Sequence, residues 1–165
     1  MTQASLYQRN MALLAKAGVA YQEYQHEPVL TYQQAQQVRE RFAISGSESK
    51  SLFLRLKNGR YCMFVTLEGR RYQRGALQAV VGGRFSLASD EELTQHTSCQ
   101  PLAACPFGHV EPVQLVVDDA VFQAERFIYS PGPASHTLVV EGKDIPQLLA
   151  ASDVNHQIYR EPSGE

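Results

Sequence analysis

The stretch Ser51-Leu-Phe-Leu-Arg-Leu-Lys-Asn-Gly-Arg-Tyr-Cys-Met-Phe-Val-Thr-Leu67 contains two apolar runs on either side of Asn58-Gly59. Two apolar runs around Asn-Gly predict a β-hairpin, because this dipeptide accepts the positive φ angles of a type I′ turn. Both runs are apolar at most positions, which is typical of strands that are buried within a sheet. We therefore expect residues 51–57 and 61–67 to form central strands.

Capping and stop signals predict helices on either side of this hairpin. Thr31 with Gln34 and Ser89 with Glu92 are capping pairs, which predict helices over 32–42 and 90–97. An apolar stripe that ends at Gly18 predicts a first helix over 5–17. The other expected elements are strands at 20–25, 84–88, 114–117, 126–129 and 137–141, helices at 75–81 and 144–151, and a loop over 98–112.

These strands and helices follow one another without a regular βαβ repeat, which favours an α+β fold over a Rossmann fold. Gly82-Gly83 alone carries no dinucleotide-binding signature. We expect a mixed α/β architecture in which a mixed sheet curls towards a pseudo-barrel and helices flank it. The length of 165 residues fits a single domain over 1–165, with its core at about 5–151 and a loose C-terminal tail.

The composition excludes several classes of protein. No apolar run approaches the roughly 20 residues that span a bilayer, and the N-terminus lacks a signal-peptide pattern, so we expect a cytoplasmic protein without membrane association. The net charge of −2 requires any contact with nucleic acid to come from a local patch. The five histidines show no metal-binding spacing, and no cofactor motif is present, so we expect neither a metal nor an organic cofactor.

Several motifs occur in an order that resembles a known family. They are His26-Glu-Pro28 before Thr31, Lys50-Ser-Leu-Phe-Leu before the hairpin, Arg84-Phe-Ser-Leu-Ala-Ser89, Cys105-Pro-Phe-Gly108, Leu115-Val-Val-Asp118 and Lys143-Asp-Ile145. Together they resemble the YbaK/ProX family of aminoacyl-tRNA editing domains, and the similarity covers nearly the whole chain.

The resemblance implies a free-standing, metal-independent deacylase that hydrolyses the ester of a mischarged tRNA in trans. The family's lysine corresponds to Lys50, and its Gly-x-x-x-Pro loop to Leu102 to Pro106. Leu102 stands where the glycine is usual, and Ser130 where many members have a histidine. The expected partner is the 3′ CCA end of aminoacyl-tRNA, and an aminoacyl-tRNA synthetase is a second candidate.

Three residues are the expected catalytic groups. The ammonium of Lys50 is suited to contact the terminal phosphate, the ribose or the ester carbonyl, although a lysine before a strand is more often merely solvated. The backbone N–H groups of Phe107 and Gly108 are candidate donors to the oxyanion of the tetrahedral intermediate. Cys99 and Cys105 leave a cysteine nucleophile as an alternative, for which no partner base is evident.

The expected substrate-binding residues come from the family resemblance and from positions near the late turn; they are His26, Thr31, Leu102, Pro106, Ser130 and His136. Some have a second interpretation. His26 is about equally typical of a half-buried histidine at a strand end, and Thr31 is first of all a helix cap. His109, just after the loop, is a further general-base candidate.

A basic segment follows the hairpin turn. Arg70, Arg71 and Arg74 are candidates for contact with tRNA phosphates, which would be sequence-independent and sensitive to salt. The alternative is a solvated rim that keeps sheet edges from pairing.

The sequence therefore predicts an aminoacyl-tRNA deacylase. The alternative is a catalytically weak module of the same fold that binds tRNA or a synthetase, which Leu102 favours. A third possibility is an esterase or amidase that acts on small molecules.

Overall fold

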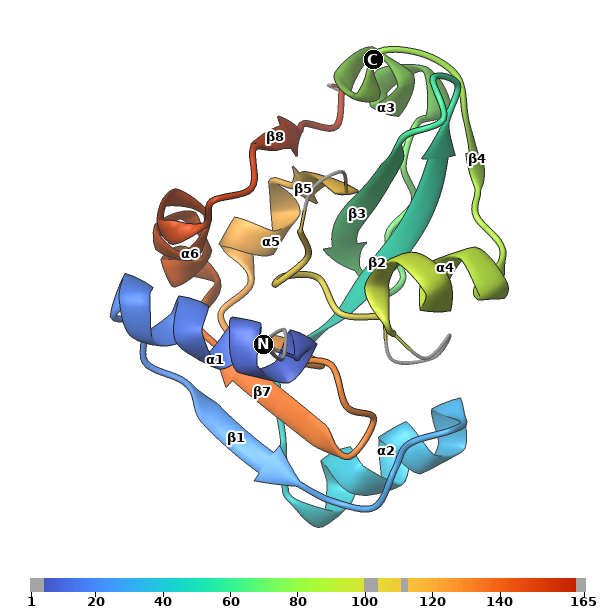
Figure 1. The fold of residues 1–165 in the computed structure, drawn as a ribbon. Coiled ribbons are helices and arrows are strands. Elements are labelled where there is room, and N and C mark those ends of the chain that lie inside the picture. The colour runs from blue at the N-terminus through green and yellow to red at the C-terminus, as the bar shows by residue number, and fades with distance from the viewer. Residues whose placement is uncertain (1–4, 100–103, 111–112, 163–165) are drawn as a thin grey trace.

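The hairpin lies at the centre of a mixed sheet (Figure 1). The computed structural model describes residues 5–99, 104–110 and 113–162. Strands β2 (Ser47–Leu56) and β3 (Tyr61–Leu67) are antiparallel, and the strand order is β1-β7-β6-β2-β3-β5-β8, with β4 paired to β2. The predicted mixed α/β fold is confirmed.

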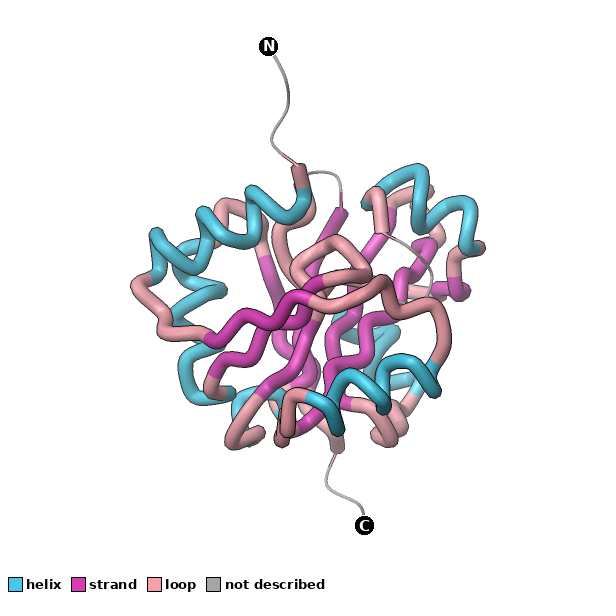
Figure 2. The backbone as a smooth tube through the Cα atoms, turned by 90° about the horizontal axis from the view of Figure 1, so that it is seen from below, coloured by secondary structure: helices cyan, strands magenta, loops and turns pink. Residues whose placement is uncertain are grey.

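The helices surround the strands, as Figure 2 shows. The remaining strands are β1 (Gln22–Gln25), β4 (Phe85–Leu87), β5 (Val113–Asp118), β6 (Phe127–Tyr129), β7 (His136–Val140) and β8 (His156–Tyr159). The helices are α1 (Leu6–Ala17), α2 (Tyr32–Arg41), α3 (Arg74–Val81), α4 (Asp90–Thr97), α5 (Ala120–Gln123) and α6 (Ile145–Ala151), with a 3-10 turn at Gly142–Asp144 before α6. No helix in the described ranges is long and apolar enough to cross a bilayer.

Strand β2 belongs to both halves of the sheet. Its first residues, Ser47 and Glu48, pair in parallel with β6, and residues 49–55 pair antiparallel with β3. Gly46 makes the first pairing possible. Its φ is +143°, and a Cβ there would lie 2.8 Å from both the carbonyl oxygen and the Cβ of Arg126. Strand β2 therefore connects the β1-β7-β6 half to the β3-β5-β8 half.

Both faces of the hairpin are buried, as predicted. Phe53, Met63 and Val65 belong to the main apolar cluster with α1 and α6, whereas Leu54 and Phe64 belong to a second cluster beside α3. Burial of each such side chain contributes roughly 1.5–3 kcal/mol to folding. The hairpin thus lies between two apolar clusters and contributes side chains to both.

The turn of the hairpin differs from the prediction. The N–H of Gly59 donates to the oxygen of Leu56 (3.0 Å), and the N–H of Leu56 donates to the oxygen of Arg60 (2.7 Å). Gly59 has a φ of +80°, but Asn58 has no positive φ, so the predicted type I′ turn is wrong. A three-residue loop with a glycine bulge forms instead. The side chain of Asn58 accepts a hydrogen bond from the N–H of Arg60 (3.0 Å), which holds this geometry.

The structure also extends the core beyond its predicted end near residue 151. Strand β8 pairs in parallel with β5, and its Tyr159 is fully buried. The hydroxyl of Tyr159 accepts a hydrogen bond from the N–H of Gln73 (2.9 Å) at the start of α3. The prediction missed β8 because His156-Gln-Ile-Tyr159 is a short, mostly polar edge strand with a weak local pattern. Helix α5 was missed because its four residues are too few to show a helical period.

Candidate active site

A cleft of about 590 Å³ opens between α2 and the first half of β2. Tyr32 and Arg39 line it from α2, and Glu48 and Lys50 line it from β2. Ala104 contributes from the segment after α4. The cleft therefore lies where β2 passes from one half of the sheet to the other.

Of the three expected catalytic residues, Lys50 is the one that lines this cleft. Its backbone is fixed by pairing with Thr66 of β3, and its side chain is half-buried. Among the described residues, no acidic group forms an ion pair with Lys50. Its ammonium is thus available to a negatively charged or carbonyl group of a ligand.

A smaller chamber of about 70 Å³ adjoins the cleft, and the two share Ala35, Arg39 and Glu48 in their walls. This side chamber is lined by three residues that the sequence analysis assigned to substrate binding, His26, Ser130 and His136. They come from the end of β1, the turn after β6 and the start of β7, respectively. The fold thus brings these three residues together beside Lys50.

Hydrogen bonds fix the two histidines of the side chamber. His26 lies 2.8 Å from Thr137 through Nε2 and 2.8 Å from the oxygen of Glu27 through Nδ1. His136 Nδ1 lies 2.9 Å from the carboxylate of Glu23, which also accepts a hydrogen bond from the hydroxyl of Tyr7 (2.6 Å). That bond to Glu23 raises the pKa of Tyr7 to about 12. Both histidine rings in the chamber wall are therefore held in fixed orientations.

Comparison with known proteins identifies the family. The family model of the aminoacyl-tRNA editing domain matches residues 26–148, which is well over half of the chain and includes every residue named above in the walls of the cleft and the side chamber. The chain belongs to this family. The resemblance inferred from the sequence is confirmed.

Solved structures share the fold of this editing domain. One is described as a candidate trans-editing enzyme for prolyl tRNA synthetase, with 18% identity, a TM-score of 0.69, and coverage of 98% of this chain and 100% of that chain. Another is a hypothetical protein, with 16% identity, a TM-score of 0.73, and coverage of 90% and 97%. A candidate signal transduction protein from Marinobacter aquaeolei VT8 contains the fold within a longer chain, with 16% identity, a TM-score of 0.60, and coverage of 95% and 31%. No curated protein matches the sequence.

The editing domain also places two charged residues in the cleft that the sequence analysis did not single out. Glu48 and Arg39 form an ion pair of 3.5 Å in the wall shared by the cleft and the side chamber. Burial raises the pKa of Glu48, and the charge of Arg39 partly opposes this shift. Glu48 stands two positions before Lys50, a spacing that puts both on one face of a strand. That signal was missed because the strand was expected to begin at residue 51.

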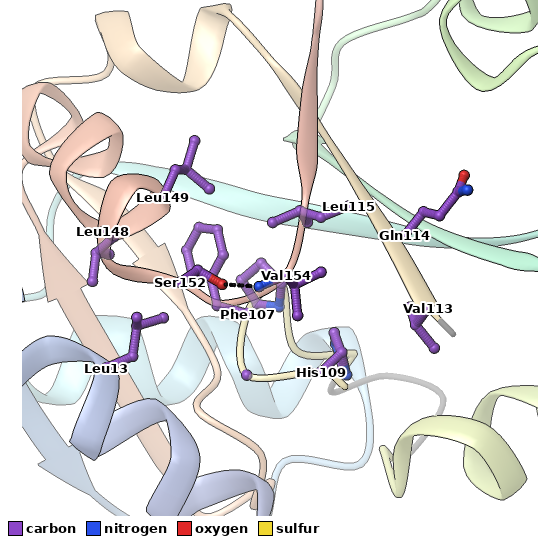
Figure 3. A pocket seen from close by; sticks show the side chains of 12 residues that line it. Leu13, Phe107, His109, Val113, Gln114, Leu115, Leu148, Leu149, Ser152 and Val154 are labelled. Carbon is purple, nitrogen blue, oxygen red and sulfur yellow. Dashed lines mark hydrogen bonds between the residues drawn. The ribbon is translucent and has the colours of Figure 1, made fainter. Parts of the chain in front are cut away.

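The Cys105-Pro-Phe-Gly108 loop of the editing domain lies in a different place. Pro106, Phe107 and Gly108 line a separate small cavity against α6, where Figure 3 shows Phe107 near Leu148 and Leu149. Asn10 donates to the oxygen of Phe107 (2.9 Å), which anchors the loop to α1. None of Pro106, Phe107 and Gly108 lines the cleft of Lys50 or its side chamber. Leu102 lies outside the described residues.

Other expected groups have structural partners. Thr31 caps α2 by accepting a hydrogen bond from the N–H of Gln34 (3.1 Å), and it lines neither the cleft nor the side chamber. Burial raises the pKa of both Cys99 and Cys105, which argues against a thiolate nucleophile. Burial lowers the pKa of His109 to about 4. In the described ranges, no group of three or more His, Cys, Asp or Glu side chains is arranged to hold a metal ion.

The three arginines expected to contact tRNA differ in their surroundings. Arg70 pairs with the buried Asp118 (2.9 Å) and with Glu161 (3.2 Å). Arg74 donates to the oxygen of Phe85 (2.7 Å) and lies over its ring. Arg71 is exposed, and no carboxylate of the described residues pairs with it. Of the three, Arg71 has the side chain best placed to reach a phosphate.

Proposed function

We propose that this editing domain is a trans-editing deacylase, which hydrolyses the ester between a wrongly attached amino acid and the 3′ end of tRNA. The observation that carries the proposal is Lys50, which forms no ion pair with the described residues and lies in a cleft that adjoins a small chamber. The family match supports the same substrate class.

The two cavities suit the two parts of such a substrate. The cleft has room for the terminal adenosine, and the side chamber, at about 70 Å³, admits only a small amino acid side chain. His26, Ser130 and His136 would contact that side chain. A chamber of this size would select against large side chains by exclusion.

The reaction needs few protein groups. A water molecule attacks the ester carbonyl, the bond to the ribose oxygen breaks, and the amino acid leaves as its carboxylate. One proton of the water goes to the ribose oxygen, and the other is released to solvent. The ammonium of Lys50 would stabilise the developing oxyanion or hold the terminal phosphate. We propose that neither a metal nor an organic cofactor takes part. The site of action would be the cytoplasm, with the CCA end as partner and a synthetase as a second candidate.

A deacylation screen tests this function. The purified protein is mixed, in the presence of EDTA, with tRNAs charged with correct and incorrect amino acids, and release of the amino acid is followed over time. We expect fast release from one or a few mischarged species with small side chains. Lys50→Ala should slow this release roughly 100-fold or more, since loss of one oxyanion donor has an effect of that size.

A matched lysine provides the control. Lys57 lies in the exposed turn of the same hairpin, outside the cleft, so Lys57→Ala should retain the wild-type rate. Absence of release from every charged tRNA would contradict the proposed function. Equal rates for Lys50→Ala and the wild type would remove Lys50 from the reaction.

A further inference from the structure

Glu48 occupies the junction between the cleft and the side chamber. Of the residues that the structure describes, Ala35, Arg39 and Glu48 line both cavities, and Glu48 is the acidic one. Pairing of β2 with β6 at Ile128 fixes its backbone. A ligand that extends from the cleft into the chamber must therefore pass beside this carboxylate.

The carboxylate of Glu48 has an unmet capacity for hydrogen bonds. Its side chain is 33% exposed, but its Oε2 atom is buried and accepts no hydrogen bond from the described residues. Arg39 lies 3.5 Å from that atom, which is long for a hydrogen bond. Ser51, in the same cleft, also has a buried hydroxyl without a partner. Buried polar atoms normally have partners, so these atoms point to a ligand that supplies donors.

The position of Lys50 indicates which ligand group belongs at Glu48. Two positions along a strand correspond to about 6.6 Å, with both side chains on the same face. The carboxylate of Glu48, paired with Arg39, thus lies at the chamber mouth, whereas the ammonium of Lys50 lies further out in the cleft. An aminoacyl ester has the complementary order, since its ammonium is on the amino acid side of the carbonyl and its phosphate is on the ribose side.

We propose that Glu48 binds the α-ammonium group of the amino acid, so that the cleft accepts only esters whose amino group is free. This inference rests on the proposed function and specifies its substrate class. Acylation of the amino group removes its charge and two of its donors, and leaves the buried Oε2 atom of Glu48 without a donor from the ligand. Peptidyl or N-formyl esters are then rejected, and so is any ester without an amino group.

Paired substrates test the role of Glu48. The tRNA species that the wild type deacylates is prepared with a free amino group and with an N-acetylated one. For the wild type, acetylation should lower kcat/KM roughly 30-fold or more, as expected when a partly buried carboxylate loses a charged ligand group. Glu48→Gln should lower kcat/KM on the free amine by a similar factor, mostly through an increase in KM. The kcat/KM of this variant should change little when the amino group is acetylated.

Glu68→Gln is the matched control. Glu68 is an exposed carboxylate in the wall of the same cleft, so this variant removes the same charge from the same cavity. It should retain the sensitivity of the wild type to acetylation. Circular dichroism of each variant checks that the fold is intact.

Three outcomes would overturn the inference. The wild type could hydrolyse both substrates equally, Glu48→Gln could retain the wild-type ratio, or Glu48→Gln could lower kcat equally on both substrates. The last result would assign Glu48 to activation of water. Failure of the proposed function is distinguishable, because a stable amide analogue of aminoacyl-adenosine measures binding without hydrolysis. In that titration the wild type should still prefer the free amine, and Glu48→Gln should not.

Discussion

His109 is bound through only one of its ring nitrogens. Nε2 lies 2.5 Å from the oxygen of Cys105 and must carry the proton to donate there, whereas Nδ1 is buried without a partner among the described residues. Protonation of the ring would place a second N–H where the described residues offer no acceptor. Burial accordingly lowers the pKa of His109 to about 4 from its ordinary value near 6.5.

This histidine should make stability depend on acid pH. A pKa that is lower in the folded state gives stability that is complete above pH 6.5 and is lost as the pH falls towards 4. We expect a loss of about 3 kcal/mol in the free energy of unfolding over that window. Urea denaturation between pH 7.5 and 4 measures it.

His109→Gln is the informative variant, because glutamine retains a donor for Cys105 but does not titrate. Its free energy of unfolding should fall less over the same window. The exposed His96 serves as control, since His96→Gln should retain the wild-type pH dependence. Identical pH profiles for His109→Gln and the wild type would contradict this account.

At the scale of elements, the start of β2 is the segment on which the cleft depends. Glu48 and Lys50 hold their places because the chain reaches β6 closely at Gly46. An added Cβ would contact the backbone of Arg126, which has little freedom to move away.

Gly46→Ala should therefore destabilise the protein by about 2 kcal/mol and lower the rate of deacylation. Gly83 is a matched control, since its φ of +152° is similar but nothing lies within 4 Å of an added Cβ. Gly83→Ala should have a smaller effect on stability and none on the rate. Thermal denaturation and the deacylation assay are applied to both variants. Both variants carry the strain of a positive φ, but only Gly46→Ala adds the contact with Arg126, so the difference between them measures that contact. Equal losses in both variants would show that the contact with Arg126 is unimportant.

The elements that could be predicted are those with a local cause. The apolar runs around Asn58-Gly59 and the caps at Thr31 and Ser89 depend on neighbouring residues, and each appears in the structure. The polar start of β2 at Ser47 and the polar β8 could not be predicted, because parallel pairing with β6 and β5 makes them strands.

The site follows the same division. Lys50 precedes a recognisable strand and matched the family motif, so the sequence was sufficient to locate it. The ion pair of Glu48 with Arg39 forms because Val38 of α2 packs against Ile128 of β6 and Val139 of β7, next to the start of β2, and no local pattern encodes that packing. The predicted turn type at Asn58 was wrong because the hydrogen bond from the N–H of Arg60 to the side chain of Asn58 stabilises a different turn.

For the whole molecule, with a net charge of −2, the proposed binding of tRNA would depend on a few local cations. Arg71→Ser should weaken tRNA binding and reduce the slope of log affinity against log salt by about 0.7–0.9, the value for one phosphate contact. Its free energy of unfolding should not change. Binding titrations at several salt concentrations measure the slope.

Arg70→Ser should act differently. In this variant the buried Asp118 keeps its hydrogen bond from Thr66 but loses its ion pair with Arg70. This loss should lower the free energy of unfolding by about 3 kcal/mol. An unchanged salt slope for Arg71→Ser would remove this residue from the tRNA-binding surface.

The division of β2 between two halves of the sheet has an evolutionary consequence. The pairing with β3 holds Lys50, whereas residues near β1, β6 and β7 surround the side chamber. Mutations in the chamber wall can therefore change which amino acid is admitted while the lysine keeps its position. A lineage with this architecture can acquire new specificities through mutations in the β1-β7-β6 half of the sheet, while selection preserves the half that holds Lys50.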